Sequence, residues 1–125
     1  MKRSVLFASV IITIFVGIDA LNTCSIAEMT AAYNEMVRAN CANCDKYFHC
    51  IGNYNAVYKC SGILQVATAE AMSNARELFG GNSGTTDSEA DQAANRLGRS
   101  GGNCAETYLA AGNCAWNPST KECTW

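Results

Sequence analysis

The chain has 125 residues, with nine basic and eleven acidic side chains and a formal net charge of −2 at pH 7. Nucleic acids and anionic membranes select proteins with a basic footprint, so this balance argues against both as partners. The length is typical of one domain.

Residues 1–20 have the pattern of a secretory signal peptide. Lys2 and Arg3 form a basic start, an apolar run follows, and Ala20 is a small residue at a plausible cleavage site. The apolar run is shorter than a comfortable membrane span. We therefore expect a secreted, extracellular protein with one domain over residues 21–125 and no membrane insertion after signal cleavage.

The first expected element of the mature chain is a helix over residues 26–40. Ser25 and Glu28 match a capping box, in which each side chain bonds a free backbone N–H of the first turn. Apolar residues then recur at helical spacing.

The next stretch, CANCDKYFHCIGNYNAVYKC, spans residues 41–60 and contains the single histidine of the chain. Two structures fit residues 44–60. Gly52 and Asn53 between two aromatic runs favour a β-hairpin with a tight turn. The aromatic residues also share one helical face, although a glycine in mid-segment weakens a helix. We expect the hairpin, and the helix remains the alternative.

A second helix is predicted over residues 63–79, with Gly80 as its end. Its apolar stripe, which we expect to pack in the core, comprises Leu64, Ala67, Ala71, Ala75, Leu78 and Phe79. Thr86 and Glu89 form another capping box, and Gly98 is expected to end the helix that follows. Because glycine- and serine-rich loops flank this helix, residues 80–102 are expected to be the most mobile part.

A short helix is predicted over residues 104–111, with Asn103 as its N-cap. The tail contains Asn117-Pro118 turn chemistry between two short apolar runs, which predicts a hairpin. The fold class is therefore a small, disulfide-rich, α-dominated α+β fold, with about four short helices and one or two β-hairpins.

All eight cysteines follow the signal peptide. An even number in a small secreted chain predicts four disulfides, and the sequence leaves their pairing open. They are Cys24, Cys41, Cys44, Cys50, Cys60, Cys104, Cys114 and Cys123.

Metal and catalytic interpretations of residues 41–60 are disfavoured. Cys41, Cys44 and His49 match the start of a zinc-knuckle spacing, but the fourth position is Tyr54, and the secretory route oxidises paired thiols. A thiolate nucleophile needs a free cysteine, and an even count leaves none. We expect no catalytic residue, no metal and no other cofactor, and we assign His49 no task.

A third interpretation is a stapled surface that presents aromatic rings to a ligand. Aromatic side chains stack on sugars and anchor protein interfaces. The candidates lie near cysteines, in residues 41–60 and in the tail. They are Tyr47, Phe48, Tyr54, Tyr58, Trp116 and Trp125.

These two regions resemble the peritrophin-A, or type 2, chitin-binding domain of invertebrates. The spacing Cys44-x5-Cys50-x9-Cys60 matches the domain, with the aromatic pair Tyr47-Phe48 inside the first interval, and WNPSTKECTW resembles its later F-N-P…C-D-W stretch. The resemblance implies a Cys60–Cys123 bridge and a Cys50 bridge to Cys24 or Cys41. It also implies a sugar-facing side of Trp116, Asn117 and Trp125, with Tyr47 and Phe48 supporting the sheet.

Two functions follow from these observations. The resemblance implies a non-enzymatic extracellular module that binds chitin or a related glycan. The acidic charge and the capped helices favour the alternative, a secreted helical protein that acts on a receptor protein as a pheromone, toxin or effector.

Overall fold

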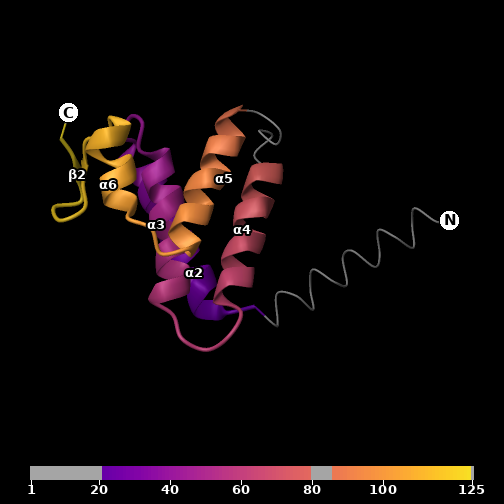
Figure 1. Ribbon diagram of the computed structural model, residues 1–125. Coiled ribbons are helices and arrows are strands. Elements are labelled where there is room, and N and C mark those ends of the chain that lie inside the picture. Colours follow the sequence, from indigo (N-terminus) through magenta and orange to yellow (C-terminus); the bar gives the residue numbers. More distant parts are fainter. Residues whose placement is uncertain (1–20, 80–85, 125) are drawn as a thin grey trace.

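The structure is a computed structural model that describes residues 21–79 and 86–124 (Figure 1). The predicted signal peptide therefore lies outside the described residues. The elements in chain order are α2 (Thr23–Ala39), α3 (Asp45–Tyr58), α4 (Gln65–Phe79), α5 (Thr86–Arg99), α6 (Cys104–Tyr108), the 3-10 helix η1 (Ala110–Gly112), β1 (Trp116–Asn117) and β2 (Glu122–Cys123). This arrangement confirms the predicted α-dominated fold with a small hairpin and four disulfides.

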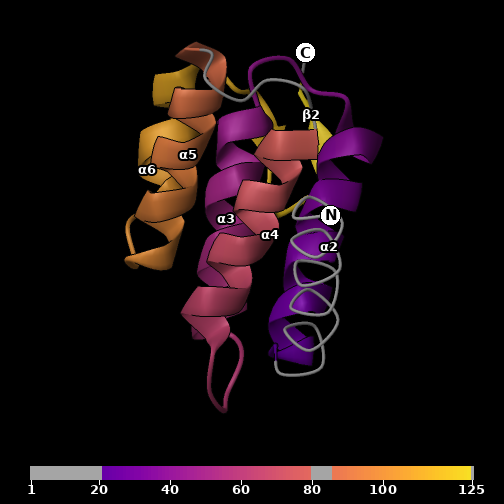
Figure 2. The same ribbon diagram turned by 90° about the vertical axis from the view of Figure 1, so that its right-hand side faces the viewer.

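The long helices form a bundle in which α3 is the central element. Helix α3 packs most extensively against α2 and α5, and α4 contacts all three of these helices (Figures 1 and 2). Helix α6 and the terminal hairpin lie beside α3, away from α4 (Figure 1). Among the described residues, every helix is too short or too polar to cross a membrane.

Residues 45–58 are helical, so the hairpin prediction for residues 44–60 is wrong. Gly52 provides close approach rather than a turn, since a Cβ there would lie 2.9 Å from the Ala32 Cβ on α2. Asn53 is fully buried, and its Nδ2 donates hydrogen bonds to the His49 carbonyl and to Asn95 Oδ1. Helices on several sides of α3 bury both residues, which outweighs the low helix propensity of glycine.

Helix α2 begins earlier than the capping box predicts. The N-cap is Asn22, whose Oδ1 accepts a hydrogen bond from the Ser25 amide. Ser25 is inside the helix, and its hydroxyl donates to the Ala56 carbonyl of α3 at 2.7 Å. A second predicted cap is confirmed, because Asn103 Oδ1 accepts from the Glu106 amide at the start of α6.

Helix α5 continues through Gly98, where the sequence predicts an end. A Cβ at Gly98 would overlap the backbone carbonyl of Cys50, so the glycine allows α5 to lie directly on α3. The expected mobility of residues 80–102 stays a prediction. Residues 80–85 lie outside the described residues, and residues 86–99 form α5.

The terminal hairpin pairs Trp116 with Cys123 and Asn117 with Glu122. Asn117 Oδ1 accepts hydrogen bonds from the amides of Ser119 and Thr120, which stabilises the turn around Pro118.

The disulfides differ from the pairing that the resemblance implies. They join Cys24 to Cys60, Cys41 to Cys123, Cys44 to Cys114, and Cys50 to Cys104. The implied Cys60–Cys123 bridge is wrong, because helical α3 carries Cys60 to the start of α2. The implied bridges from Cys50 to Cys24 or Cys41 are wrong as well, because Cys50 faces α6.

Candidate functional sites

The aromatic residues that were predicted to face a ligand lie mostly in the core. The exposed fractions are 6% for Tyr47, 1% for Phe48 and 7% for Trp116. The Phe48 ring meets Tyr47 and Trp116 edge to face, each at 5.3 Å between centroids. The predicted exposed aromatic surface is therefore wrong for these three residues, because the Cys44–Cys114 bridge draws the tail onto α3.

The remaining predicted residues do not add to that surface. Asn117 is half-buried and its side-chain oxygen is engaged in the hairpin turn. Trp125 lies outside the described residues. Tyr54 and Tyr58 pack on one another at 4.9 Å between ring centroids, and Tyr58 is half exposed.

Helix α4 turns its apolar stripe towards solvent, although the sequence predicts that stripe in the core. The side chains it buries are Thr68, Ala69, Ser73 and Glu77, three of which are polar. Leu78 and Phe79 are 64% and 84% exposed. The residues of the stripe, together with Ile63 and Val66, are called here the apolar face of α4. They are Ile63, Leu64, Val66, Ala67, Ala71, Ala75, Leu78 and Phe79, and all are exposed.

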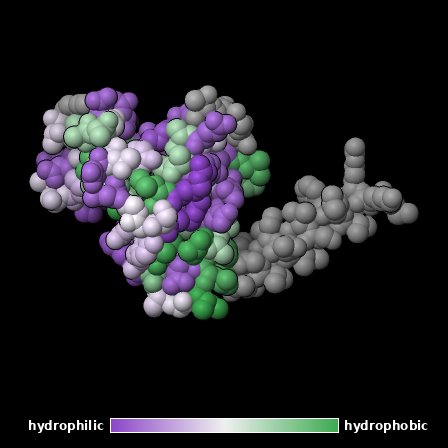
Figure 3. Space-filling model, viewed as in Figure 1, coloured by the Kyte–Doolittle hydropathy of each residue, from purple (hydrophilic) through white to green (hydrophobic). Residues whose placement is uncertain are grey.

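One end of this face is the turn between α3 and α4. Ile63 is 76% exposed there, and apolar surface gathers at this end of the molecule (Figure 3). Asn22 Nδ2 holds the turn from α2, donating to the carbonyls of Ser61 and Ile63. Leu64 has a φ of 67°, a left-handed conformation that costs a non-glycine residue about 1 kcal/mol or more.

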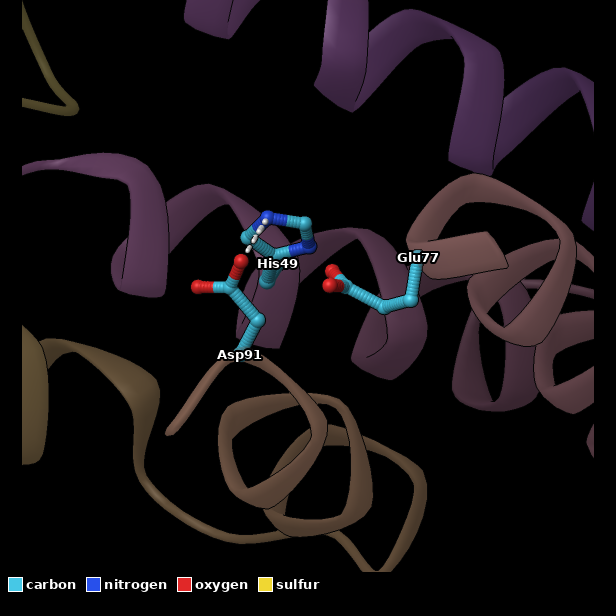
Figure 4. Close-up of side chains that lie close together, drawn as sticks. All are labelled: His49, Glu77 and Asp91. Carbon is cyan, nitrogen blue, oxygen red and sulfur yellow. Dashed lines mark ion pairs between the residues drawn. The ribbon is translucent and has the colours of Figure 1, made fainter. Parts of the chain in front are cut away.

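A second site is a buried polar cluster between three helices. It consists of His49 on α3, Glu77 on α4 and Asp91 on α5, with exposed fractions of 3%, 6% and 5% (Figure 4). His49 Nε2 lies 3.5 Å from Asp91 Oδ2. The Ser88 hydroxyl donates to Glu77 Oε2 at 2.7 Å.

Burial dominates the protonation of this cluster. It lowers the pKa of His49, against the opposing effect of the Asp91 carboxylate, so the ring favours its neutral form. Burial also raises the pKa of Glu77, and the nearby Asp91 carboxylate raises it further.

Lys46 closes one side of the cluster. Its Nζ lies 2.6 Å from Asp91 Oδ1, 2.8 Å from Asp87 and 2.7 Å from Asp45. Although burial opposes its charge, these three carboxylates raise the pKa of Lys46 well above its usual range.

A cleft of about 720 Å³ opens beside the cluster. His49, Glu77 and Asp91 line it together with apolar side chains. The latter include Tyr33, Met36, Met72, Ala75 and Phe79. The cleft gives solvent and small ions a route to the buried polar groups.

Sequence reasoning missed Glu77 and Asp91 because both lie on helix faces that a hydrophobic pattern assigns to solvent. A signal was present in the spacing. Ser73 and Glu77 on α4, and Asp91 and Asn95 on α5, are each four residues apart and so share a helix face.

Fold and composition define the class as a small, secreted, disulfide-closed helical protein. The sequence pattern of the serum amyloid A protein family matches residues 21–113. The chain is 47% identical over 90 residues to serum amyloid A protein of Notamacropus eugenii, covering 68% of this chain and 69% of the relative. It therefore belongs to the serum amyloid A family.

Other relatives give similar values. Serum amyloid A-5 protein of Mesocricetus auratus is 47% identical over 89 residues, covering 68% of this chain and 82% of the relative. Serum amyloid A-3 protein of Oryctolagus cuniculus is 49% identical over 78 residues, which cover 59% of this chain and 61% of the relative. The protein is secreted and extracellular, as its relatives in serum are.

Family membership corrects the functional expectations. The peritrophin-A resemblance is wrong, and chitin or glycan binding is wrong with it. The alternative of a pheromone, toxin or effector is wrong too. Two short cysteine spacings with adjacent aromatics recur in unrelated disulfide-bonded folds, whereas the family match extends over most of the mature chain.

Proposed function

We propose that this protein is a secreted, non-enzymatic apolipoprotein that attaches to a phospholipid-covered lipoprotein surface through the apolar face of α4. The observation that carries the proposal is the orientation of α4, which buries polar side chains and exposes its apolar stripe. Membership in the serum amyloid A family supports the proposal.

A helix in this orientation has the chemistry of an interfacial helix. Such helices lie in the plane of the interface, with the apolar side in the acyl region and the polar side in water or on protein. Here the polar side of α4 is satisfied inside the bundle, since Ser73 donates to Asn53 Oδ1 and Glu77 accepts from Ser88. The helix can therefore dock on lipid without unfolding.

The turn before α4 extends this face. Ile63 and Val66 there are 76% and 49% exposed. Leu64 keeps its side chain partly in solvent despite an unfavourable backbone conformation. Strain of this kind is retained most often where a segment serves binding.

Flotation with phosphatidylcholine vesicles tests the proposal. We expect the Leu78→Ser, Phe79→Ser double variant to partition onto vesicles at least about tenfold more weakly, because burying each of these side chains is worth about 1.5–3 kcal/mol. Its stability should barely change, since both side chains are already exposed.

Val37→Ser is the matched control. Val37 is 73% exposed on α2 and does not belong to the apolar face of α4, so this variant should float like the wild type. Equal flotation of the double variant and the wild type would contradict the proposal. If the double variant instead abolished a dimer in light scattering and left flotation intact, the face would bind a second copy of the chain.

A further inference from the structure

We propose that His49, Glu77 and Asp91 form a binding site for a divalent metal ion with the coordination chemistry of zinc. The three residues come from α3, α4 and α5, and one ligand atom from each lies within 4.8 Å of the other two (Figure 4). The three residues are buried and none belongs to the apolar face of α4, so this proposal does not rest on lipid binding.

The histidine is the observation that points to a ligand. Its Nδ1 is buried and has no hydrogen-bond partner among residues 21–79 and 87–124. The edge of the ring that bears Nδ1 faces the Glu77 carboxylate (Figure 4). A buried polar atom left without a partner costs about 1–3 kcal/mol, and a metal ion held between Nδ1 and the Glu77 carboxylate would remove that cost.

The second ring nitrogen of His49 faces the other carboxylate. His49 Nε2 and Asp91 Oδ2 are 3.5 Å apart, which is long for an N–H···O hydrogen bond. One imidazole binds a metal ion through one nitrogen. With the metal on Nδ1 beside Glu77, the Nε2–H stays directed at Asp91 Oδ2, and Asp91 orients the ring as carboxylate partners of metal-bound histidines do.

The donor set selects the class of ion. Zinc accepts imidazole nitrogen and carboxylate oxygen, and water fills the coordination positions that protein ligands leave open. Calcium and magnesium prefer oxygen ligands alone, and calcium takes six to eight of them. The neutral ring that burial favours at His49 is the form that binds a metal.

The charges leave room for a cation. Asp91 is paired with Lys46, whereas Glu77 is bonded to a neutral hydroxyl, Ser88, and to no basic side chain in an ion pair among the described residues. Two basic side chains lie near the site: Lys46 Nζ is 2.6 Å from Asp91 Oδ1, and the Arg76 guanidinium is 4.3 Å from the centroid of the Tyr33 ring.

A neighbouring acidic group provides the contrast. Asp45, Asp87 and Asp91 also lie close together, but the Lys46 ammonium occupies the space between them. That group has its cation already, so Asp45 and Asp87 serve as controls. The adjoining cleft gives the metal an entry path and supplies the water ligand.

Titration of EDTA-stripped, disulfide-intact protein with zinc chloride tests the site. Calorimetry at about pH 7 should show one zinc ion per chain, and zinc should raise the Tm in a way that EDTA reverses. Calcium and magnesium at the same concentration should do neither. Glu77→Gln and His49→Gln should each weaken zinc binding at least about tenfold, since each removes a ligand.

The controls make each outcome decisive. Asp45→Asn with Asp87→Asn should keep wild-type zinc affinity, because neither side chain belongs to the site. Glu77→Gln retains the length of the side chain and an acceptor for Ser88, so it remains usable if circular dichroism shows that His49→Gln is unfolded. Unchanged zinc affinity in Glu77→Gln, or equal binding of calcium, would overturn the proposal.

Discussion

The two sides of α3 are stabilised by different physics. On the side of α6 and the tail, Phe48 and Trp116 form an aromatic core that three disulfides enclose. On the side of α4 and α5 the interior holds many polar side chains beside a small apolar cluster of Met29, Ala56 and Ala69, and neither helix contains a cysteine.

The two sides of α3 are expected to respond differently to pH and to ions. Disulfides and aromatic packing respond little to pH or to ions, so the cross-linked side acts as a fixed frame. Buried amides, carboxylates and an imidazole respond to both. The polar side is also where α4 exposes its apolar face, so the surface proposed for lipid and the cluster proposed for metal share one helix.

The family match sharpens this contrast. It ends at residue 113, just before Cys114. Two of the four disulfides therefore join the matched region to the tail beyond it, through Cys114 and Cys123. The tail therefore adds cross-links to the side of α3 that contacts α6. The polar side, formed by α4 and α5, lies wholly within the matched residues.

The largest expected effect is the loss of a bridge from the frame. Cys44→Ala with Cys114→Ala should lower the free energy of unfolding by about 2–5 kcal/mol, because the bridge closes a long loop. The two cysteines are 70 residues apart. Urea unfolding followed by circular dichroism measures the change.

The Cys24–Cys60 bridge is the control for that experiment. It joins residues only 36 apart and lies at the other end of α3, so its removal should cost less. If the free energy of unfolding did not change without the Cys44–Cys114 bridge, the aromatic core would not depend on that disulfide.

The next effect concerns the contact between the two sides. Gly98→Ala should destabilise the protein by about 2–3 kcal/mol, since the new methyl would press on the Cys50 carbonyl of α3. Helix propensity alone predicts the opposite sign. Gly112→Ala meets no close neighbour and should change stability by less than about 0.5 kcal/mol. Thermal unfolding of both variants shows whether the packing of Gly98 against α3 or the helix propensity of alanine decides the change in stability.

A smaller effect tests the polar interior. Asn53→Ala should cost about 1–2 kcal/mol, because Asn95 and Arg99 each lose a hydrogen-bond partner. If these groups act as a network, the costs of Asn53→Ala and Asn95→Ala will not add in the double variant. Strict additivity in denaturant unfolding would mean that the amides contribute independently.

The smallest expected effect is a change in pH dependence. Burial lowers the pKa of His49 from its ordinary value of 6.5. Below about pH 6.5 the imidazole is therefore protonated more in the unfolded chain than in the folded chain, and the free energy of unfolding falls. Around the ring, Asp91 and Asp45 favour the proton, whereas Arg76 and Lys46 oppose it. His49→Gln should flatten this decline.

Glu77 contributes with the opposite sign. Burial raises its pKa above 4.5, so the folded chain binds a proton before the unfolded chain does, and this gain appears as the pH falls through the raised pKa. The difference between wild type and His49→Gln in melting curves from about pH 7.5 to 5.5 isolates the imidazole, because His49 is the one histidine of the chain. Identical slopes in wild type and variant would exclude it as the cause.

The sequence by itself determined the fold class and most of the helices. Eight cysteines after a secretory pattern indicated four disulfides, and apolar spacing with polar caps located the helices to within a few residues. These features are local, or depend on composition alone, so no partner is needed to define them.

Only the tertiary structure decided which way the elements face. Residues 45–58 became a helix because close packing at Gly52 and Asn53 outweighed their turn preference. The apolar spacing in α4 predicts which of its residues share a face. Whether that face is buried or exposed depends on how α4 packs against α2, α3 and α5. Disulfide pairing, the burial of Tyr47, Phe48 and Trp116, and the meeting of His49 with Glu77 and Asp91 all require residues far apart in sequence to come together, and helical periodicity contains no information about such distances.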